Sequence, residues 1–124
     1  MPGVPAFILR RLYVKGSLTN AENGWSFTLR NSLGSGHANG LIPLKLDETT
    51  EIPMRLTSFV SDRTLVTFDQ VSEDNTFGLK MNKEIVINIT GDRLTPGEHS
   101  IYFACIVPGL GKIGFDFVDV IADD

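Results

Sequence analysis

The sequence contains a single cysteine, so the chain cannot form an internal disulfide. Secreted domains of this size usually carry paired cysteines, and the N-terminal stretch MPGVPAFILRRLYVKG lacks the basic, apolar and small-residue order of a signal peptide. No apolar run approaches the roughly 20 residues that span a bilayer. These absences predict a soluble, cytoplasmic protein that does not bind membranes.

Basic residues are also scarce, with 11 Lys and Arg against 15 Asp and Glu and a net charge of −4. Proteins that bind nucleic acids neutralise phosphates with clustered basic side chains. The one small cluster, formed by Arg10, Arg11 and Lys15, is interrupted by apolar residues, and we interpret it as the solvated face of a strand. We therefore expect no nucleic-acid partner.

Helical periodicity is missing as well, and the dominant period of the sequence is two. Apolar and polar residues alternate in GWSFTLRN, EIVINIT, HSIYFACIV and KIGFDFVDVI, which predicts half-buried strands. Less regular strands are expected at Phe7–Val14, Gly40–Asp47, Ile52–Val60 and Thr64–Val71. The alternation changes phase after Phe117, which predicts a β-bulge. Residues 71–83 show no clear alternation, and we expect a loop there, or one helical turn that starts at Ser72.

Short strands separated by turn residues, with no helices between them, predict a single all-β domain over residues 1–124. Parallel strands would need crossover helices. We therefore expect an antiparallel two-sheet sandwich of about seven to nine strands, of the immunoglobulin-like kind. The alternating apolar residues form its predicted core, which consists of Trp25, Phe27, Leu29, Leu44, Leu46, Ile85, Ile87, Ile89, Ile101, Phe103, Cys105, Phe115 and Phe117.

The stretch RLTPGEHSIYFACIV, residues 93–107, carries the only cysteine and one of the two histidines. Pro96 and Gly97 favour a turn, so we interpret His99 as a ring that ties this corner down before the next strand. Cys105 falls on the apolar face of that strand, which predicts a buried thiol that packs as a small hydrophobe. The alternatives are a metal ligand or general base at His99 and a nucleophile at Cys105, but neither has a suitable partner nearby in the sequence.

The glycine-rich loop GSGHANG, residues 34–40, contains His37 and Asn39. It matches neither a phosphate-binding loop nor the dinucleotide fingerprint. The His and Cys residues lack zinc-site spacing, and the acidic residues between positions 62 and 74 lack the spacing of a calcium loop. We expect no catalytic residue, no cofactor and no metal. His37, Asn39 and Tyr102 are the candidate contacts for a ligand or a partner.

The stretches SLTNAENGWSFTLRNSLGSG, LIPLKLDETTEIP, SEDNTFGL, LTPGEHSIYF and GKIGFDF lie between about Leu18 and Val120. With them the chain resembles a group of short bacterial and archaeal proteins, some of which are labelled hydroxymethylglutaryl-CoA reductase. That label implies a Lys, Asp, Glu and His substrate site and a nicotinamide fold, and the chain contains neither motif. LIPLKLDETTEIP and LTPGEHSI are also similar to the small β-subunit of C-glycoside deglycosidases. This second resemblance implies a β-sandwich subunit beside a barrel subunit that holds the metal and the catalytic residues.

We expect a non-catalytic interaction or accessory domain that is not an enzyme on its own. It would form a homo-oligomer or pack on a partner enzyme, because core strands are also apolar on their opposite faces, at Val86, Tyr102, Ile106, Val118 and Val120. One alternative is the small β-subunit of a barrel-type sugar-active lyase. Another is a carbohydrate- or small-ligand-binding module that uses His37 and Asn39, with Trp25 or Tyr102 as a stacking surface. A hydrolase or lyase with a carboxylate pair is the remaining alternative.

Overall fold

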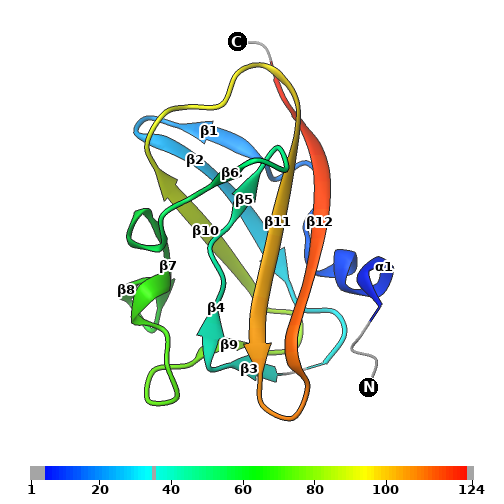
Figure 1. The fold of residues 1–124 in the computed structure, drawn as a ribbon, viewed down its shortest axis with the longest axis vertical. Helices are drawn as coiled ribbons and strands as arrows, with labels where there is room; N and C mark the ends of the chain where they lie inside the picture. The colour runs from blue at the N-terminus through cyan, green and yellow to red at the C-terminus, as the bar shows by residue number, and fades with distance from the viewer. Residues whose placement is uncertain (1–4, 35, 123–124) are drawn as a thin grey trace.

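The structure is a computed structural model that describes residues 5–34 and 36–122 (Figure 1). Over these residues the first sheet has the antiparallel strand order β1 (Thr19–Ala21), β2 (Gly24–Arg30), β10 (Glu84–Thr90), β7 (Thr57–Ser61) and β8 (Thr64–Thr67). The second sheet has the order β12 (Gly111–Ile121), β11 (Gly97–Val107), β5 (Lys45–Leu46) and β6 (Thr50–Glu51), and β4 (Gly40–Leu41) also pairs with β11. A small ladder joins β3 (Gly36–Ala38) to β9 (Phe77–Leu79).

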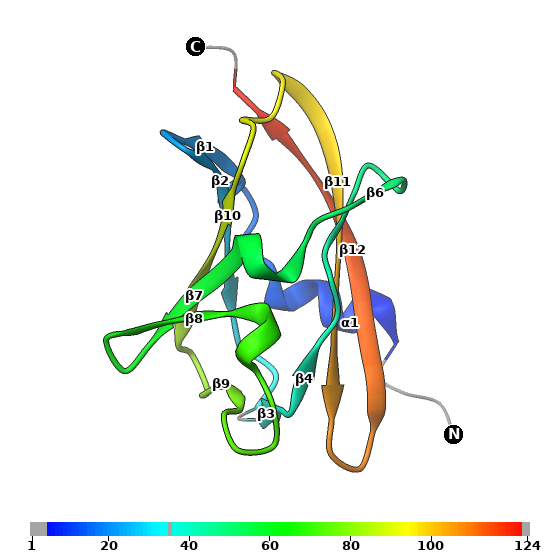
Figure 2. The ribbon, with the colours of Figure 1, turned by 60° about the vertical axis from the view of Figure 1, so that its left-hand side comes forward.

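The two sheets face each other, with β2, β10 and β7 on one side and β11 and β12 on the other (Figure 2). The prediction of an all-β antiparallel sandwich is therefore confirmed. The described chain has twelve strands instead of seven to nine, because several are only two or three residues long. The strand expected at Gly40–Asp47, for example, is divided into β4 and β5 around Pro43, which has no N–H to donate to β11.

The core between the sheets contains the alternating residues that the sequence indicates. All predicted core residues are buried except Leu46 and Ile85, which are half-buried and pack against the core. Three further phenylalanines, Phe59, Phe68 and Phe77, are buried beside Phe103 and form a set of edge-on and tilted rings. The residues around Phe68 and Phe77 have no clear alternation, so the period of two does not reveal them.

The prediction of a strand at Phe7–Val14 is wrong. The segment forms the short helix α1 (Ala6–Leu9) and the 3₁₀ turn η1 (Arg10–Leu12), which lie beside β12 (Figure 1). Leu9, Leu12 and Tyr13 follow one another at spacings of three and one, so a helical turn directs all three toward the core. A strand would have placed Leu9 and Leu12 on opposite faces.

The prediction of a β-bulge after Phe117 is also wrong. Every residue of β11 has one partner on β12, from Gly97 opposite Ile121 to Val107 opposite Gly111, so the ladder has no extra residue. The apparent change of phase arises because Val118 and Val120 are exposed, at 54% and 58%, on the outer face. The alternation therefore continues through apolar residues that point away from the core.

The segment 71–83, expected to be a loop or one helical turn from Ser72, contains the short strand β9. The strand expected at Thr64–Val71 ends at Thr67, because η3 (Phe68–Gln70) follows, with a capping box formed by Thr67 and Gln70. The strand expected at Ile52–Val60 begins only at Thr57, because the 3₁₀ turn η2 (Met54–Leu56) precedes β7. No helix of the described residues is long and apolar enough to cross a membrane.

Candidate functional site

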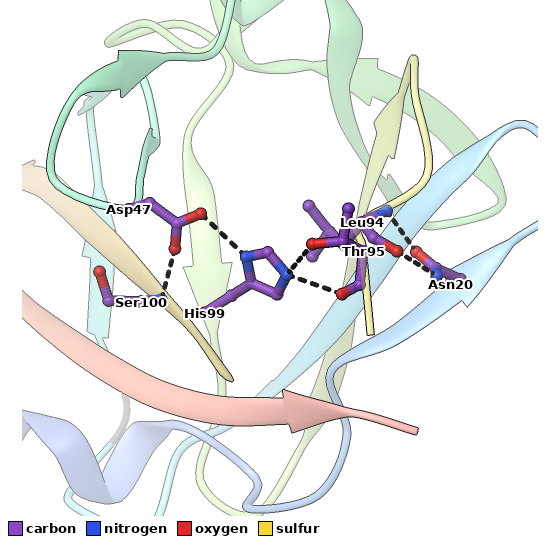
Figure 3. Close-up of polar contacts among 6 residues, drawn as sticks. All are labelled: Asn20, Asp47, Leu94, Thr95, His99 and Ser100. Atoms are coloured by element: carbon purple, nitrogen blue, oxygen red, sulfur yellow. Dashed lines mark hydrogen bonds and ion pairs between the residues drawn. The ribbon is translucent and has the colours of Figure 1, made fainter. Parts of the chain in front are cut away.

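The most extensive polar network surrounds the corner between β10 and β11 (Figure 3). Nδ1 of His99 lies 2.8 Å from Oδ2 of Asp47, and its Nε2 lies 2.8 Å from the backbone carbonyl oxygen of Thr95. The other carboxylate oxygen of Asp47 accepts a hydrogen bond from the backbone N–H of Ser100. The network therefore joins the β5–β6 turn, the corner and the start of β11.

A second pair of hydrogen bonds holds the other side of the same corner. The side-chain amide of Asn20 on β1 donates to the carbonyl oxygen of Leu94 at 2.8 Å and accepts from the Leu94 N–H at 2.7 Å. Both hydrogen-bonding groups of the Leu94 backbone are thus satisfied by one side chain, while the Leu94 side chain is buried. The corner is fastened to both sheets.

The geometry around His99 favours its protonated form. The carbonyl oxygen of Thr95 and the ionised carboxylate of Asp47 can only accept hydrogen bonds, so both ring nitrogens must donate. Burial lowers the pKa of His99, but the bonds to Asp47 and Thr95 outweigh it and raise the pKa above 6.5. Burial likewise raises the pKa of Asp47, whereas the bonds from His99 and Ser100 bring it below 3.8.

The network has no group left for chemistry. The His99 side chain is only 10% exposed, and both ring nitrogens are engaged in hydrogen bonds with Asp47 and Thr95. The interpretation of His99 as the ring that ties down the corner is confirmed. The sequence did not indicate its partner Asp47, which lies 52 positions away.

Replacing His99 with glutamine is expected to destabilise the protein by about 1–2 kcal/mol, because a charge-assisted hydrogen bond is lost. The raised pKa of His99 means that its contribution is complete below pH 6.5 and is lost as the pH rises through the pKa of the folded state. The contribution of Asp47 is complete above pH 3.8 and is lost as the pH falls further.

Urea denaturation of wild type and His99→Gln at several pH values checks this prediction. The difference in free energy of unfolding should be largest between pH 3.8 and 6.5 and should shrink on the alkaline side. The same difference at every pH would show that the imidazolium charge has no part in the fastening.

Cys105 is buried on the inner face of β11, as predicted for a packing residue. Burial raises the pKa of its thiol to about 11, so the thiolate is scarce at neutral pH. No group of three or more His, Cys, Asp or Glu side chains in the described residues has the arrangement of a metal site. Neither the Cys105 thiol nor a cluster of such side chains therefore forms a reactive centre in the described residues.

A second polar cluster holds the N-terminal segment against β12. The Tyr13 hydroxyl donates to Oδ2 of Asp119 at 2.6 Å, its ring stacks on Phe117, and burial together with this bond raises the pKa of Tyr13 to about 12. Arg10 donates to both the backbone carbonyl and the carboxylate of Asp116, and its guanidinium lowers the pKa of that carboxyl. Sequence reasoning missed this cluster because its members are more than a hundred positions apart.

The three candidate contact residues lie at separate places. His37 is exposed on β3, opposite Gly78 of β9. The N–H of Asn39 donates to the carbonyl oxygen of Ile106 at one end of β11. Tyr102 is half-buried on the outer face of β11, with its hydroxyl over Gly114. Their role as ligand contacts stays a prediction, and Ser35 of the same glycine-rich loop lies outside the described residues.

The outer faces of both sheets carry exposed apolar side chains in regular positions. Val60, Leu65 and Val86 lie on the first sheet, with exposures of 55%, 62% and 44%. On the second sheet the corresponding residues are Ile106, Val118 and Val120, which are 39%, 54% and 58% exposed. Both sheets of the described residues therefore expose large apolar side chains on their outer faces.

Comparisons with known proteins give one family. A search of curated proteins finds no match to the chain. The family described as hydroxymethylglutaryl-CoA reductase, N-terminal domain, matches residues 8–122, in agreement with the resemblance found in the sequence. This match covers all of the described strands, from β1 to β12. The chain belongs to the hydroxymethylglutaryl-CoA reductase N-terminal domain family.

Proposed function

We propose that this chain is a non-catalytic β-sandwich domain that associates with copies of itself or packs on a partner enzyme. The observation that carries the proposal is the set of exposed apolar side chains on the outer faces of the two sheets. Large apolar residues in adjacent positions on regular strands are typical of surfaces that another chain covers.

The chemistry of the described residues supports a role without catalysis. His99 uses both ring nitrogens to hold the corner, and Cys105 is buried with a raised pKa. The Asp119 carboxylate accepts hydrogen bonds from Tyr13, Gly16 and Val120. His99, Asp119 and Cys105 are thus engaged in the hydrogen bonds and packing of the fold.

The family is described as the N-terminal domain of hydroxymethylglutaryl-CoA reductase. Hydride transfer from a nicotinamide needs a cofactor-binding fold, which usually alternates strands with long helices. The helices of the described residues are single turns of three or four residues. The proposal therefore assigns the chemistry to a partner and not to this sandwich.

A second candidate function is the small β-subunit of a barrel-type sugar-active lyase. It is favoured by the segment Leu94–His99, where the L-x-P-G-x-H sequence forms a corner that a ring fastens. The same corner supports the proposal that the sandwich is of the immunoglobulin-like kind. In both candidates the outer sheet faces of this chain meet another protein.

The test is to isolate the tagged chain from its native host under gentle conditions and to measure its mass by sedimentation velocity. We expect either a mass above that of the monomer, which grows with concentration, or a stoichiometric complex with an enzyme subunit. A barrel-type enzyme in that complex would favour the second candidate. A clean monomer at every concentration, with no stoichiometric partner, would contradict the proposal.

A further inference from the structure

The outer face of the first sheet is organised in two rows that run across the strands. Val86 lies opposite Thr28 of β2, and Val60 lies opposite Leu65 of β8. Asn88 is paired with Ser58 of β7, and the same antiparallel register, extended by two residues, places Val86 next to Val60. We call Val86, Val60 and Leu65 the apolar row. The neighbouring polar row consists of Ser26, Asn88, Ser58 and Thr67.

This face is open to solvent. Leu65, Val60 and Val86 keep 62%, 55% and 44% of their surface exposed, although β7 and β10 lie in the interior of the sheet. Figure 2 shows no described helix or strand over the side of β10 and β7 that faces away from β11. Three β-branched or γ-branched side chains side by side on a flat sheet form a continuous apolar strip.

The second sheet does not offer a comparable strip. The exposed Val118 lies two residues from Asp116 on the same face, and Val120 is opposite Glu98. Tyr102 separates these valines from Ile106 and is itself opposite Asp116 and Lys45. Charged side chains therefore interrupt the apolar residues there, and packing two such faces would desolvate them.

The charges around the apolar row are compatible with a second copy of the same face. Neither row contains a charged residue. Charges lie along one border, at Arg30, Glu84, Asp62 and Arg63, and beside the polar row at Asp69, which accepts a hydrogen bond from Thr67. The four border charges comprise two of each sign, so the border does not select a partner of opposite charge. A two-fold axis along the apolar row would place this border over the polar row of the other copy, where hydroxyl and amide groups can hydrogen-bond to it.

The area of the face is sufficient for a weak dimer. A sheet five strands wide, with strands up to seven residues long, measures roughly 500 Å² from ordinary strand spacing and rise. Two such faces would together bury about 1,000 Å², the lower limit for a specific interface. We propose that a second copy of this chain packs face to face on the first sheet, about a two-fold axis along the apolar row.

This inference rests on the proposed function and deepens it, because it names the partner and the face. Replacing Val60 with lysine should weaken self-association by about tenfold or more, since packing would bury an ammonium without a partner. The matched control is Val118→Lys, which places the same charge at an equally exposed valine of the second sheet. Sedimentation equilibrium measures both, and thermal unfolding verifies that each variant is folded.

Chemical crosslinking tests the axis. The chain has one cysteine and it is buried, so Val60→Cys provides a single accessible thiol. Packed sheets lie about 10 Å apart, which is too far for a direct disulfide but suits a short bis-maleimide. Because the axis runs along the apolar row, the introduced thiols of two Val60→Cys chains should lie close together and crosslink in high yield. Two Val118→Cys chains should not crosslink.

The outcomes separate this inference from the proposed function. Loss of association in Val60→Lys but not in Val118→Lys, together with crosslinking of Val60→Cys, would support it. Association that survives Val60→Lys, or a dimer that crosslinks only through Val118→Cys, would overturn the assignment of the face while leaving an interaction domain. A wild-type monomer that binds only a different protein through this face would overturn the assignment of a second copy.

Discussion

Phe103→Ala is expected to destabilise the protein by about 3–5 kcal/mol, because truncating a buried phenylalanine loses its burial and leaves a cavity. Phe103 is 2% exposed on the inner face of β11. Its ring lies 5.9–6.4 Å, centroid to centroid, from those of Phe68, Phe77 and Phe115. These rings come from three separate elements, β12, β9 and η3, so no single neighbour can move to fill the space.

Urea denaturation measures this effect as a shift of the midpoint at an unchanged slope. Since a domain of this kind is stable by about 5–15 kcal/mol, the variant should retain little stability at higher temperature. Ile106→Ala is the control, because Ile106 lies on the same strand but is 39% exposed on the outer face. Equal losses in the two variants would mean that the inner face of β11 is not the centre of the core.

Gly24→Ala is expected to have the second large effect, about 2–4 kcal/mol, through overpacking and backbone strain. A Cβ atom at Gly24 would lie 1.8 Å from the backbone oxygen of Ile89, a distance that no rotamer change can relieve. Gly24 also has a positive φ of 155° and pairs with both Ala21 and Thr90. The substitution must therefore separate β2 from β10 where the β1–β2 turn ends and β2 begins.

The control for Gly24→Ala is Gly78→Ala. A Cβ at Gly78 meets no atom within 4 Å, and its backbone is not in the positive-φ region, so stability should change little. Chemical denaturation of the two variants gives the comparison. A Gly24→Ala protein as stable as Gly78→Ala would mean that β10 does not pass as close to the β1–β2 turn as the structure has it.

Much of the sandwich could be predicted because its strands and turns depend on patterns among residues that are close together in the sequence. Alternating residues such as Phe27, Ile87 and Phe103 report directly which side of a strand is buried, and all three are in the core. The corner at Pro96 and Gly97 is likewise a short-range signal, and it correctly indicated that His99 holds the turn. Period and turn chemistry act over a few residues, so one sequence is enough to read them.

The features that were missed depend on long-range pairing. Asp47 meets His99 at a separation of 52 positions, Asp119 meets Tyr13 at a separation of 106, and nothing near these residues marks the partner. The N-terminal segment is β-prone by composition, yet its helical turns let Leu9 reach the core beside β12. Tertiary packing overrides local propensity in such short segments.

The apolar row itself shows the same limit. Val86 was recognised as an outward-facing apolar residue, but its neighbours Val60 and Leu65 come from strands that are distant in the sequence. Only the strand order β10, β7, β8 brings the three together on one face. The periodicity of one strand does not reveal a surface of this kind, because the surface depends on the register between strands.

The most direct measurement of the central claim is the dilution dependence of the methyl NMR signals of valine and leucine. If the first sheet is the contact face, the signals of Val60, Leu65 and Val86 should shift between micromolar and millimolar protein, while those of Val118 and Val120 stay fixed. Signals that do not change with concentration in the isolated chain, or shifts confined to Val118 and Val120, would contradict self-association through the apolar row.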